Sequence, residues 1–263
     1  MKMARLFTWF YMLFLYAPIG LIVLFSFHST PSLSLPFEGV SLRWYETIFN
    51  SYDFRTALGN SLIVAGASAL FTTLLGTLSA LALMRMKGKA KATFAFLNFA
   101  PIAMPGLFLG IALVILFSLI GLPRSLLTII IGHTLFTLPF FVESVRSRLE
   151  YFDLSFEEAA RDLGATPLKA FWLVTLPIIG PTIAGAAILT VALSLDEFLI
   201  TVFVTGTDTT LPLLILSMIR RAVDPSINAA SVIMLAMTIA IIGVAGLVMT
   251  MRRRRIELER TGE

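Results

Sequence analysis

Stretches without a charged side chain occupy much of this sequence. Asp, Glu, Lys and Arg are absent from five long stretches, at 6–37, 56–84, 92–123, 170–195 and 225–251. Because an α-helix rises about 1.5 Å per residue, roughly 20 apolar residues cross the hydrocarbon core of a bilayer. Each of the five is long enough, and the shorter stretch 125–142 is borderline. The pattern predicts an all-α, polytopic membrane protein with six transmembrane helices. It excludes a cytosolic enzyme, a nucleic-acid-binding protein and a disordered chain.

The distribution of basic residues predicts how these helices cross the membrane. We expect helices at about 7–28, 57–84, 93–120, 126–146, 173–203 and 227–251. The connecting segments then alternate between the two sides, and 15 of the 20 Lys and Arg residues fall on the side that holds the N-terminus. Lys and Arg concentrate in short cytoplasmic loops, so both termini are expected in the cytoplasm. Topology therefore explains the net charge of +4, and we expect no nucleic-acid partner.

Composition narrows the chemistry that the chain can perform. There is no cysteine and there are two histidines, so we expect neither disulfides nor a metal site. His133 is expected to be a packed, hydrogen-bonded residue and His28 a solvated one. The first apolar stretch exceeds the 7–15 residues of a signal-peptide core, which predicts a retained helix in contact with membrane lipid.

A polar segment between the fourth and fifth expected helices predicts two short cytoplasmic helices. Ser155 and Glu158 have the spacing of a capping box, and apolar residues follow at helical intervals. Gly164 is expected to end the first helix in the left-handed conformation. Thr166 is expected to cap a second helix, which 176–177 would end. The segment is either a solvated amphipathic loop or a docking site for a cytoplasmic partner, since helix-in-groove binding uses this spacing of apolar anchors.

The same segment carries a resemblance to a known family. Glu158-Ala159-Ala160 are followed after three residues by Gly164, after nine more by Val174, and after one more by Leu176-Pro177. This arrangement resembles the EAA signature of type I bacterial ABC importer permeases, EAA-x3-G-x9-I-x-LP, with Val174 in place of Ile. The resemblance covers most of the chain and implies a bacterial inner-membrane protein. It divides the chain into a first helix and external segment at 1–55, a permease core at 56–248 with coupling helices at about 153–175, and a short basic cytoplasmic tail at 249–263.

The resemblance further implies a subunit that works with other proteins. In this family the two short helices dock onto a separate ATPase, which makes Glu158 and Gly164 the central coupling residues, with Ala159 and Ala160 packing against the partner. The implied partners are an ABC ATPase dimer, a second, non-identical permease and an extracytoplasmic substrate-binding protein. No G-x-x-x-x-G-K-[ST] phosphate loop occurs in the sequence. The chain is therefore expected to be non-catalytic and to hold no cofactor, with ATP and Mg²⁺ on the partner ATPase.

An acidic pair stands out within the fifth apolar stretch. Asp196 and Glu197 lie about 19 residues beyond Pro177, roughly 28 Å along a helix, which predicts a position near its external end. A carboxylate at mid-membrane costs about 2.5–3.5 kcal/mol on insertion scales, so at least one of the pair should be neutralised. In one interpretation Arg220 or Arg221 pairs with an acid and closes a gate. In the other, the acids line the pathway and attract a cationic substrate, and both can hold at different stages of a cycle.

Two external segments are expected to form helices that do not span. Segment 29–55 contains Arg43-Trp44-Tyr45-Glu46, which predicts an interfacial helix with its aromatic side chains at headgroup level. Segment 210–222 is too short to cross the bilayer and is expected to form a surface or re-entrant helix.

A second resemblance concerns the substrate. The string SLDEFLITVFVTGTDTTLPLLILSMIRR is similar to the permeases of spermidine/putrescine importers, which implies a polyamine. Carboxylates and aromatic walls suit such a flexible polycation. Relatives that carry ferric ions, thiamine, 2-aminoethylphosphonate or opines share parts of the pattern, so these solutes are alternatives. An ATP-independent secondary transporter and a membrane anchor without transport are further alternatives. Co-purification with an ATPase would distinguish an ABC permease from both.

Overall fold

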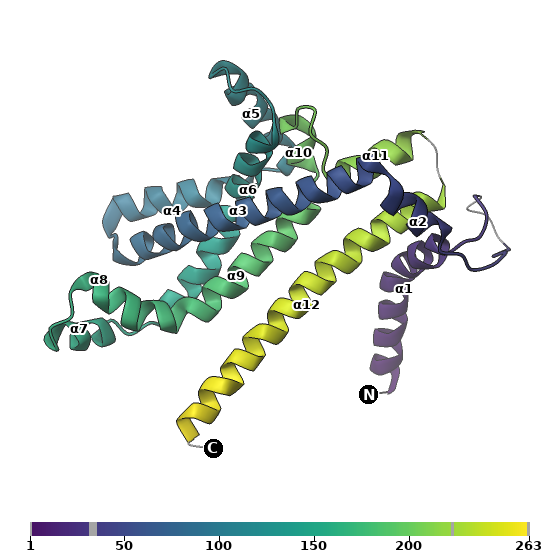
Figure 1. The fold of residues 1–263 in the computed structure, drawn as a ribbon. Helices are drawn as coiled ribbons and strands as arrows, with labels where there is room; N and C mark the ends of the chain where they lie inside the picture. Colours follow the sequence, from purple (N-terminus) through teal and green to yellow (C-terminus); the bar gives the residue numbers. More distant parts are fainter. Residues whose placement is uncertain (1, 32–35, 222–223, 262–263) are drawn as a thin grey trace. The chain divides into compact units, whose positions relative to one another are not determined.

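A computed structural model describes residues 2–31, 36–221 and 224–261 (Figure 1). Within these ranges every regular element is a helix, apart from one isolated bridge between His28 and Val40. The predicted all-α fold is confirmed. In chain order the helices are α1 (Lys2–Ser26), α2 (Arg43–Asn50), α3 (Tyr52–Arg85), α4 (Gly88–Ala103), α5 (Gly106–Leu119), α6 (Leu126–Leu149), α7 (Ser155–Asp162), α8 (Pro167–Ala170), the π-turn η1 (Phe171–Thr175), α9 (Leu176–Asp196), α10 (Leu199–Val204), α11 (Leu211–Arg221) and α12 (Pro225–Thr261).

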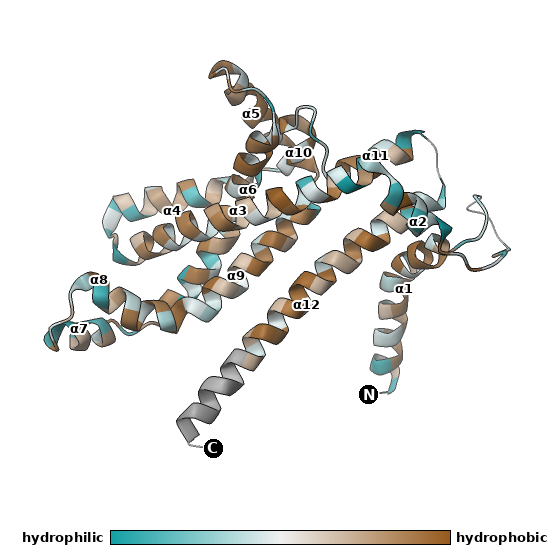
Figure 2. Ribbon diagram, viewed as in Figure 1, coloured by the Kyte–Doolittle hydropathy of each residue, from teal (hydrophilic) through white to brown (hydrophobic). Residues whose placement is uncertain are grey.

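Five helices in the described ranges are long and apolar enough to cross a membrane, and a bent pair would make a sixth span. Figure 2 shows apolar residues running along α5, α9 and α12, whereas hydrophilic and apolar residues alternate in α7. The five single spans are Arg5–Ser26, Tyr52–Arg85, Leu126–Leu149, Pro167–Asp196 and Pro225–Met251. The bent pair is α4 with α5, so the prediction of a membrane protein with six apolar spans holds.

The prediction of one continuous helix over 93–120 is wrong, because α4 and α5 meet at an angle of 109°. The break lies at Met104 and Pro105. A proline ring pushes the residue before it out of the helical region, and Met104 is accordingly extended, with φ −93° and ψ 131°. Pro105 then precedes the first turn of α5, where a missing N–H leaves no hydrogen bond unmade.

The fifth expected helix, 173–203, also differs at both ends. It stops at Asp196, and Glu197 is extended (φ −71°, ψ 112°) before α10 begins. At the other end, residues 176–177 were expected to terminate the helix that Thr166 begins. They do not, because the chain continues through η1 into α9. The Leu176 N–H bonds to the Phe171 carbonyl five residues back. This wider turn leads directly to Pro177 in the first turn of α9, where its missing N–H is tolerated.

The chain divides into two compact units, and the first comprises residues 1–59 and 209–239. Its core gathers apolar side chains from α2, the start of α3, α11 and the start of α12. Trp44 is 6% exposed and donates from Nε1 to the His28 carbonyl at 2.6 Å, with the Arg43 guanidinium 4.6 Å above its ring. The short helix expected around these residues is therefore present, but Trp44 is a core residue rather than a headgroup anchor. His28 is buried rather than solvated.

The second unit, residues 60–208 and 240–263, contains both candidate sites. Within it α6 packs against α4, α9 and α10, and α10 also packs against α5. Gly106 and Gly110 allow close packing where α5 meets α10. A side chain at Gly110 would lie 2.8 Å from Phe203 Cδ2 and 3.3 Å from Ile200 Cα. Two apolar clusters result, one around Phe141 and Val145 and one around Ile129 and Ile200.

Candidate functional site

The first candidate site is the elbow between α7 and α8. The Gly164 N–H bonds to the Arg161 carbonyl at 2.9 Å, and the Ala165 N–H reaches back to the Ala160 carbonyl at 3.0 Å. This pair of bonds is a Schellman ending, and Gly164 adopts the left-handed conformation that it requires, with φ +87°. The Thr166 side chain accepts from the Lys169 N–H at 3.3 Å and so begins α8. The elbow predicted at Gly164 is confirmed.

The start of α7 differs from the prediction. The expected capping box between Ser155 and Glu158 does not form, because Ser155 is already inside the helix. Asp153 acts instead, with Oδ1 accepting from the Ser155 N–H at 2.9 Å. Its bonds to the backbone and side chain of Ser155 lower the pKa of the Asp153 carboxyl. The cap is therefore present at neutral pH and is lost as the pH falls through that lowered pKa.

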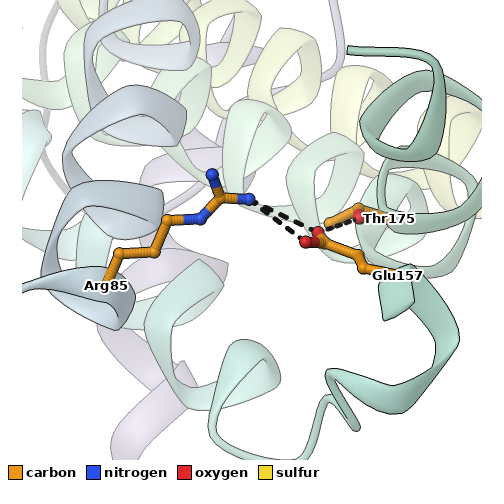
Figure 3. Close-up of polar contacts among 3 residues, drawn as sticks. All are labelled: Arg85, Glu157 and Thr175. Carbon is orange, nitrogen blue, oxygen red and sulfur yellow. Dashed lines mark hydrogen bonds and ion pairs between the residues drawn. The ribbon is translucent and has the colours of Figure 1, made fainter. Parts of the chain in front are cut away.

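Glu157 ties this elbow to the rest of its unit (Figure 3). Its carboxylate accepts from Arg85 Nη2 at the end of α3, at 3.3 Å to Oε2 and 3.5 Å to Oε1, and also from the Thr175 hydroxyl at the entrance to α9. The Glu157 side chain is only 16% exposed. This anchoring role of Glu157 was not predicted from the sequence. The sequence did contain a signal for it. Residues 157 and 158 are adjacent acids, and neighbouring helix positions point about 100° apart, so the two carboxylates point in different directions.

We expect Glu157→Ala to loosen α7. Arg85 is 59% exposed, so water screens the ion pair, and its loss should speed amide hydrogen exchange in α7 by about two- to fivefold. Exchange measured on the permease in detergent tests this. Arg85→Gln should have a similar effect, whereas Glu158→Ala, one position away on the exposed side, should leave the exchange unchanged. Equal acceleration by Glu157→Ala and Glu158→Ala would contradict the anchoring role.

Within the part of the chain that the structure describes, nothing covers the outer side of the elbow. Glu158 and Ala159 are exposed and Ala160 is partly buried. Two large apolar side chains accompany them, Phe156 at 55% and Leu163 at 90% exposure. The rest of the EAA signature lies toward the span: Val174 and Leu176 are partly buried, and Pro177 is exposed. The anchored Glu157 and the open Glu158 thus give α7 one fixed face and one free face.

The second candidate site is the acidic pair, which lies at a helix break rather than inside a helix. Asp196 is the last residue of α9 and is exposed, whereas Glu197 is partly buried. Glu197 Oε1 accepts from the Ile200 N–H at 2.8 Å, at the start of α10. The carboxylate thus bonds to an amide that would otherwise lack a partner at the beginning of a helix. This bond stabilises the carboxylate but does not neutralise its charge.

His133 of α6 holds the two sides of this break together. Its Nδ1 is 2.7 Å from Ser194 Oγ on α9, and its Nε2 is 2.7 Å from Thr201 Oγ1 on α10. The Thr201 hydroxyl donates its single proton to the Glu197 carbonyl at 2.8 Å, so it can only accept from His133. The network therefore assigns the Nε2–H tautomer, with Nδ1 accepting from Ser194. His133 is 1% exposed, so the predicted packed, hydrogen-bonded role is confirmed.

A second helix break lies beside the first. A Cβ placed on Gly106, the first residue of α5, would be 3.5 Å from the Leu199 side chain and 4.0 Å from Glu197 Oε1. The bend between α4 and α5 and the break between α9 and α10 therefore meet at Glu197. Broken helices of this kind form binding sites in many transporters. With Asp196 open and Glu197 held, the arrangement presents negative charge that can attract a cation.

The loop after α10 is held by its own close contacts. A side chain at Gly206 would collide with the Arg124 carbonyl, so this turn requires glycine. Asp208 Oδ2 accepts from the Leu126 N–H at 3.0 Å and so caps α6. Arg220 and Arg221 end α11 in the first unit and are exposed. Their pairing with one of the two acids, Asp196 or Glu197, stays a prediction.

Comparisons with known proteins agree on the family to which the chain is similar. Residues 72–258 match the family described as the binding-protein-dependent transport system inner membrane component. The chain is 38% identical over 255 residues to the putrescine transport system permease protein PotI of Escherichia coli strain K12, covering 94% of this chain and 89% of that protein. It is 34% identical over 230 residues to the spermidine/putrescine transport system permease protein PotC of that strain, covering 87% of each. A solved bacterial ABC transporter involved in the import of the acidic polysaccharide alginate shares its fold, with a TM-score of 0.74 and 20% identity over 95% of this chain and 94% of that one.

Proposed function

The chain belongs to the family of binding-protein-dependent transport system inner membrane components, and we propose that it is the permease subunit of an ATP-driven polyamine importer. In this role it forms half of the translocation pathway and carries no catalytic group. The observation that carries the proposal is the elbow at Gly164. One face of α7 is anchored through Glu157, while Glu158, Ala159 and Leu163 are left open.

The open face supports a cytoplasmic partner. Its apolar side chains recur at helical spacing beside an exposed carboxylate, as in a helix that docks into a groove. The proposed occupant is a separate ATPase dimer that binds ATP and Mg²⁺, with Glu158 and Gly164 as the central coupling residues. The anchor from Glu157 to Arg85 and Thr175 would pass movement of α7 to α3 and α9. This assignment puts α7, α8 and both termini in the cytoplasm, where the excess of Lys and Arg favours them.

The break at Asp196 and Glu197 supports a cationic substrate. Two relatives are named for putrescine and for spermidine/putrescine. Putrescine and spermidine carry ammonium groups on a flexible chain, and a pair of carboxylates complements them. Asp196 and Glu197 are the proposed pathway residues, with Arg220 and Arg221 as the proposed gate. A second, non-identical permease would form the other half of the pathway, and an extracytoplasmic binding protein would deliver the substrate. ATP-driven closure of the ATPases would switch the pathway between its two openings.

Reconstitution of the whole assembly tests the proposal. We expect the permease to co-purify with an ATPase, and Glu158→Lys to abolish co-purification by reversing the charge on the open face. Spermidine or putrescine with the binding protein should stimulate ATP turnover, whereas thiamine, ferric ion and 2-aminoethylphosphonate should not. Stimulation by one of those other solutes would retain the permease role and reject the polyamine. Uptake without any ATPase would reject the permease role itself.

A further inference from the structure

A cavity in the second unit lies away from both candidate sites. Its volume is about 440 Å³, and it lies between α4 and α6 beside the end of α3. Its lining includes Phe96 and Phe99 of α4 and Pro139, Val142, Glu143 and Arg146 of α6. Neither the coupling contacts of α7 nor the acidic break uses these residues.

The lining changes from charged to apolar along the helices. Arg146 and Glu143 lie in the last two turns of α6, and Arg85 and Lys89 mark the neighbouring ends of α3 and α4. Pro139 lies ten residues before the end of α6, roughly 15 Å deeper at 1.5 Å per residue. Phe99 is at a similar distance from the start of α4. The cavity thus begins at the charged ends of three spans and continues into their apolar part.

Two charges of opposite sign line the charged end. Arg146 Nη2 is 3.2 Å from Glu143 Oε1, and the two side chains are 34% and 42% exposed. Arg146 Nε lies 3.6 Å from Glu150 but makes no hydrogen bond within the part of the chain that the structure describes. The guanidinium therefore keeps donor capacity, and the Glu143 carboxylate keeps acceptor capacity. Arg146 would repel a simple cation and Glu143 would repel a simple anion. A ligand that carries both charges therefore fits best.

The apolar end is open to the surroundings of the spans. Phe96 is 70% exposed and Phe99 is 49% exposed, on helix α4, which together with α5 is long and apolar enough for one bent span. Roughly 15 Å along the helices from their charged ends, this part of the cavity lies at the depth of the hydrocarbon core, which is about 30 Å thick. A soluble zwitterion would leave this part of the cavity unfilled, whereas an acyl chain would cover it.

From this gradient of charge and hydropathy we infer that the cavity binds one zwitterionic phospholipid with a primary ammonium headgroup. The lipid phosphate would accept from Arg146, the ammonium would donate to Glu143, and an acyl chain would lie against Phe96, Phe99 and Val142. Hydrogen bonds between charged partners are shorter and about twice as strong as neutral ones, which makes the headgroup selective. The inference concerns lipid binding and does not depend on which solute is carried.

Native mass spectrometry of the assembled transporter tests this inference. The assembly is extracted from vesicles holding equal amounts of phosphatidylethanolamine and phosphatidylglycerol. We expect the wild type to retain one phosphatidylethanolamine, preferred at least fivefold. Glu143→Gln removes the negative charge that pairs with the ammonium and leaves the positive charge of Arg146, so the ratio should shift toward phosphatidylglycerol by about tenfold. Misfolding cannot produce such a reversal.

Arg148→Gln is the matched control, because Arg148 lies on the same last turn of α6 but is exposed and does not line the cavity. It should keep the wild-type preference. Retention of neither lipid, or an unchanged ratio in Glu143→Gln, would overturn the inference. Displacement of the bound lipid by putrescine would also overturn it, since the cavity would then belong to the transported solute.

Discussion

Gly164→Ala is expected to reduce uptake by about tenfold while leaving membrane insertion intact. The left-handed conformation costs an L-residue roughly 1–2 kcal/mol, and Gly164 adopts φ +87°. The strain would favour an altered angle between α7 and α8, so the open face would no longer match its partner. Gly164→Pro should be more severe, because proline fixes φ near −65°. Uptake and ATPase co-purification measure both effects.

The chain offers a matched control for this substitution. Gly121 also adopts a left-handed conformation, with φ +70°, and like Gly164 it has no atom within 4 Å of an added Cβ. It follows α5, far along the chain from the elbow, so Gly121→Ala imposes the same kind of backbone strain elsewhere. We expect it to lower uptake much less than Gly164→Ala. Equal losses in the two variants would mean that general destabilisation, rather than the elbow angle, explains the effect.

Removing the charge of the acidic pair is expected to weaken substrate use strongly. Hydrogen bonds to charged groups contribute about 1.5–3 kcal/mol, so Asp196→Asn with Glu197→Gln should raise the apparent KM for polyamine uptake by about 10- to 100-fold. Glutamine keeps an oxygen that can accept from the Ile200 N–H, so the start of α10 should be preserved. The double variant therefore tests charge rather than folding. Uptake of labelled spermidine by vesicles, with the KM and maximal rate separated, measures the result.

Glu46→Gln controls for a general loss of negative charge, because Glu46 is exposed on α2 in the other unit. It should leave the KM unchanged. The single variants divide the effect: Asp196 is open, whereas Glu197 already bonds to the start of α10, so Asp196→Asn should contribute the larger share. Unchanged uptake and unchanged substrate-stimulated ATP turnover in the double variant would refute the pathway assignment.

Features that depend on a few neighbouring residues were predictable. The number of apolar spans follows from charge-free length, since the cost of burying a charge in hydrocarbon applies wherever the helices pack. The left-handed Gly164 and the Thr166 cap follow from local backbone sterics and hydrogen bonding within one turn. The breaks at Pro105 and Glu197 were not predicted. A proline permits a bend, but the 109° angle reflects how α5 packs against α10.

The capping of α7 shows how two local possibilities compete. Ser155 with Glu158 and Asp153 with the following amides are both acceptable patterns, and the structure uses Asp153. Glu157 is then free to reach Arg85, 72 positions earlier in the chain. That pairing could not be predicted from spacing, because it depends on where the end of α3 comes to lie.

Local chemistry thus accounts for the spans, the elbow and the acidic pair as separate features of the chain. Their joining into sites depends on contacts between distant segments. His133 bonds to Ser194 and Thr201, 61 and 68 positions away, and so holds the break at which Glu197 lies. Hydrophobicity is non-directional and sets which segments leave water, whereas hydrogen bonds form only at defined distances and angles. Which side chains meet those conditions is decided by the packing of helices, and packing is a property of the folded chain.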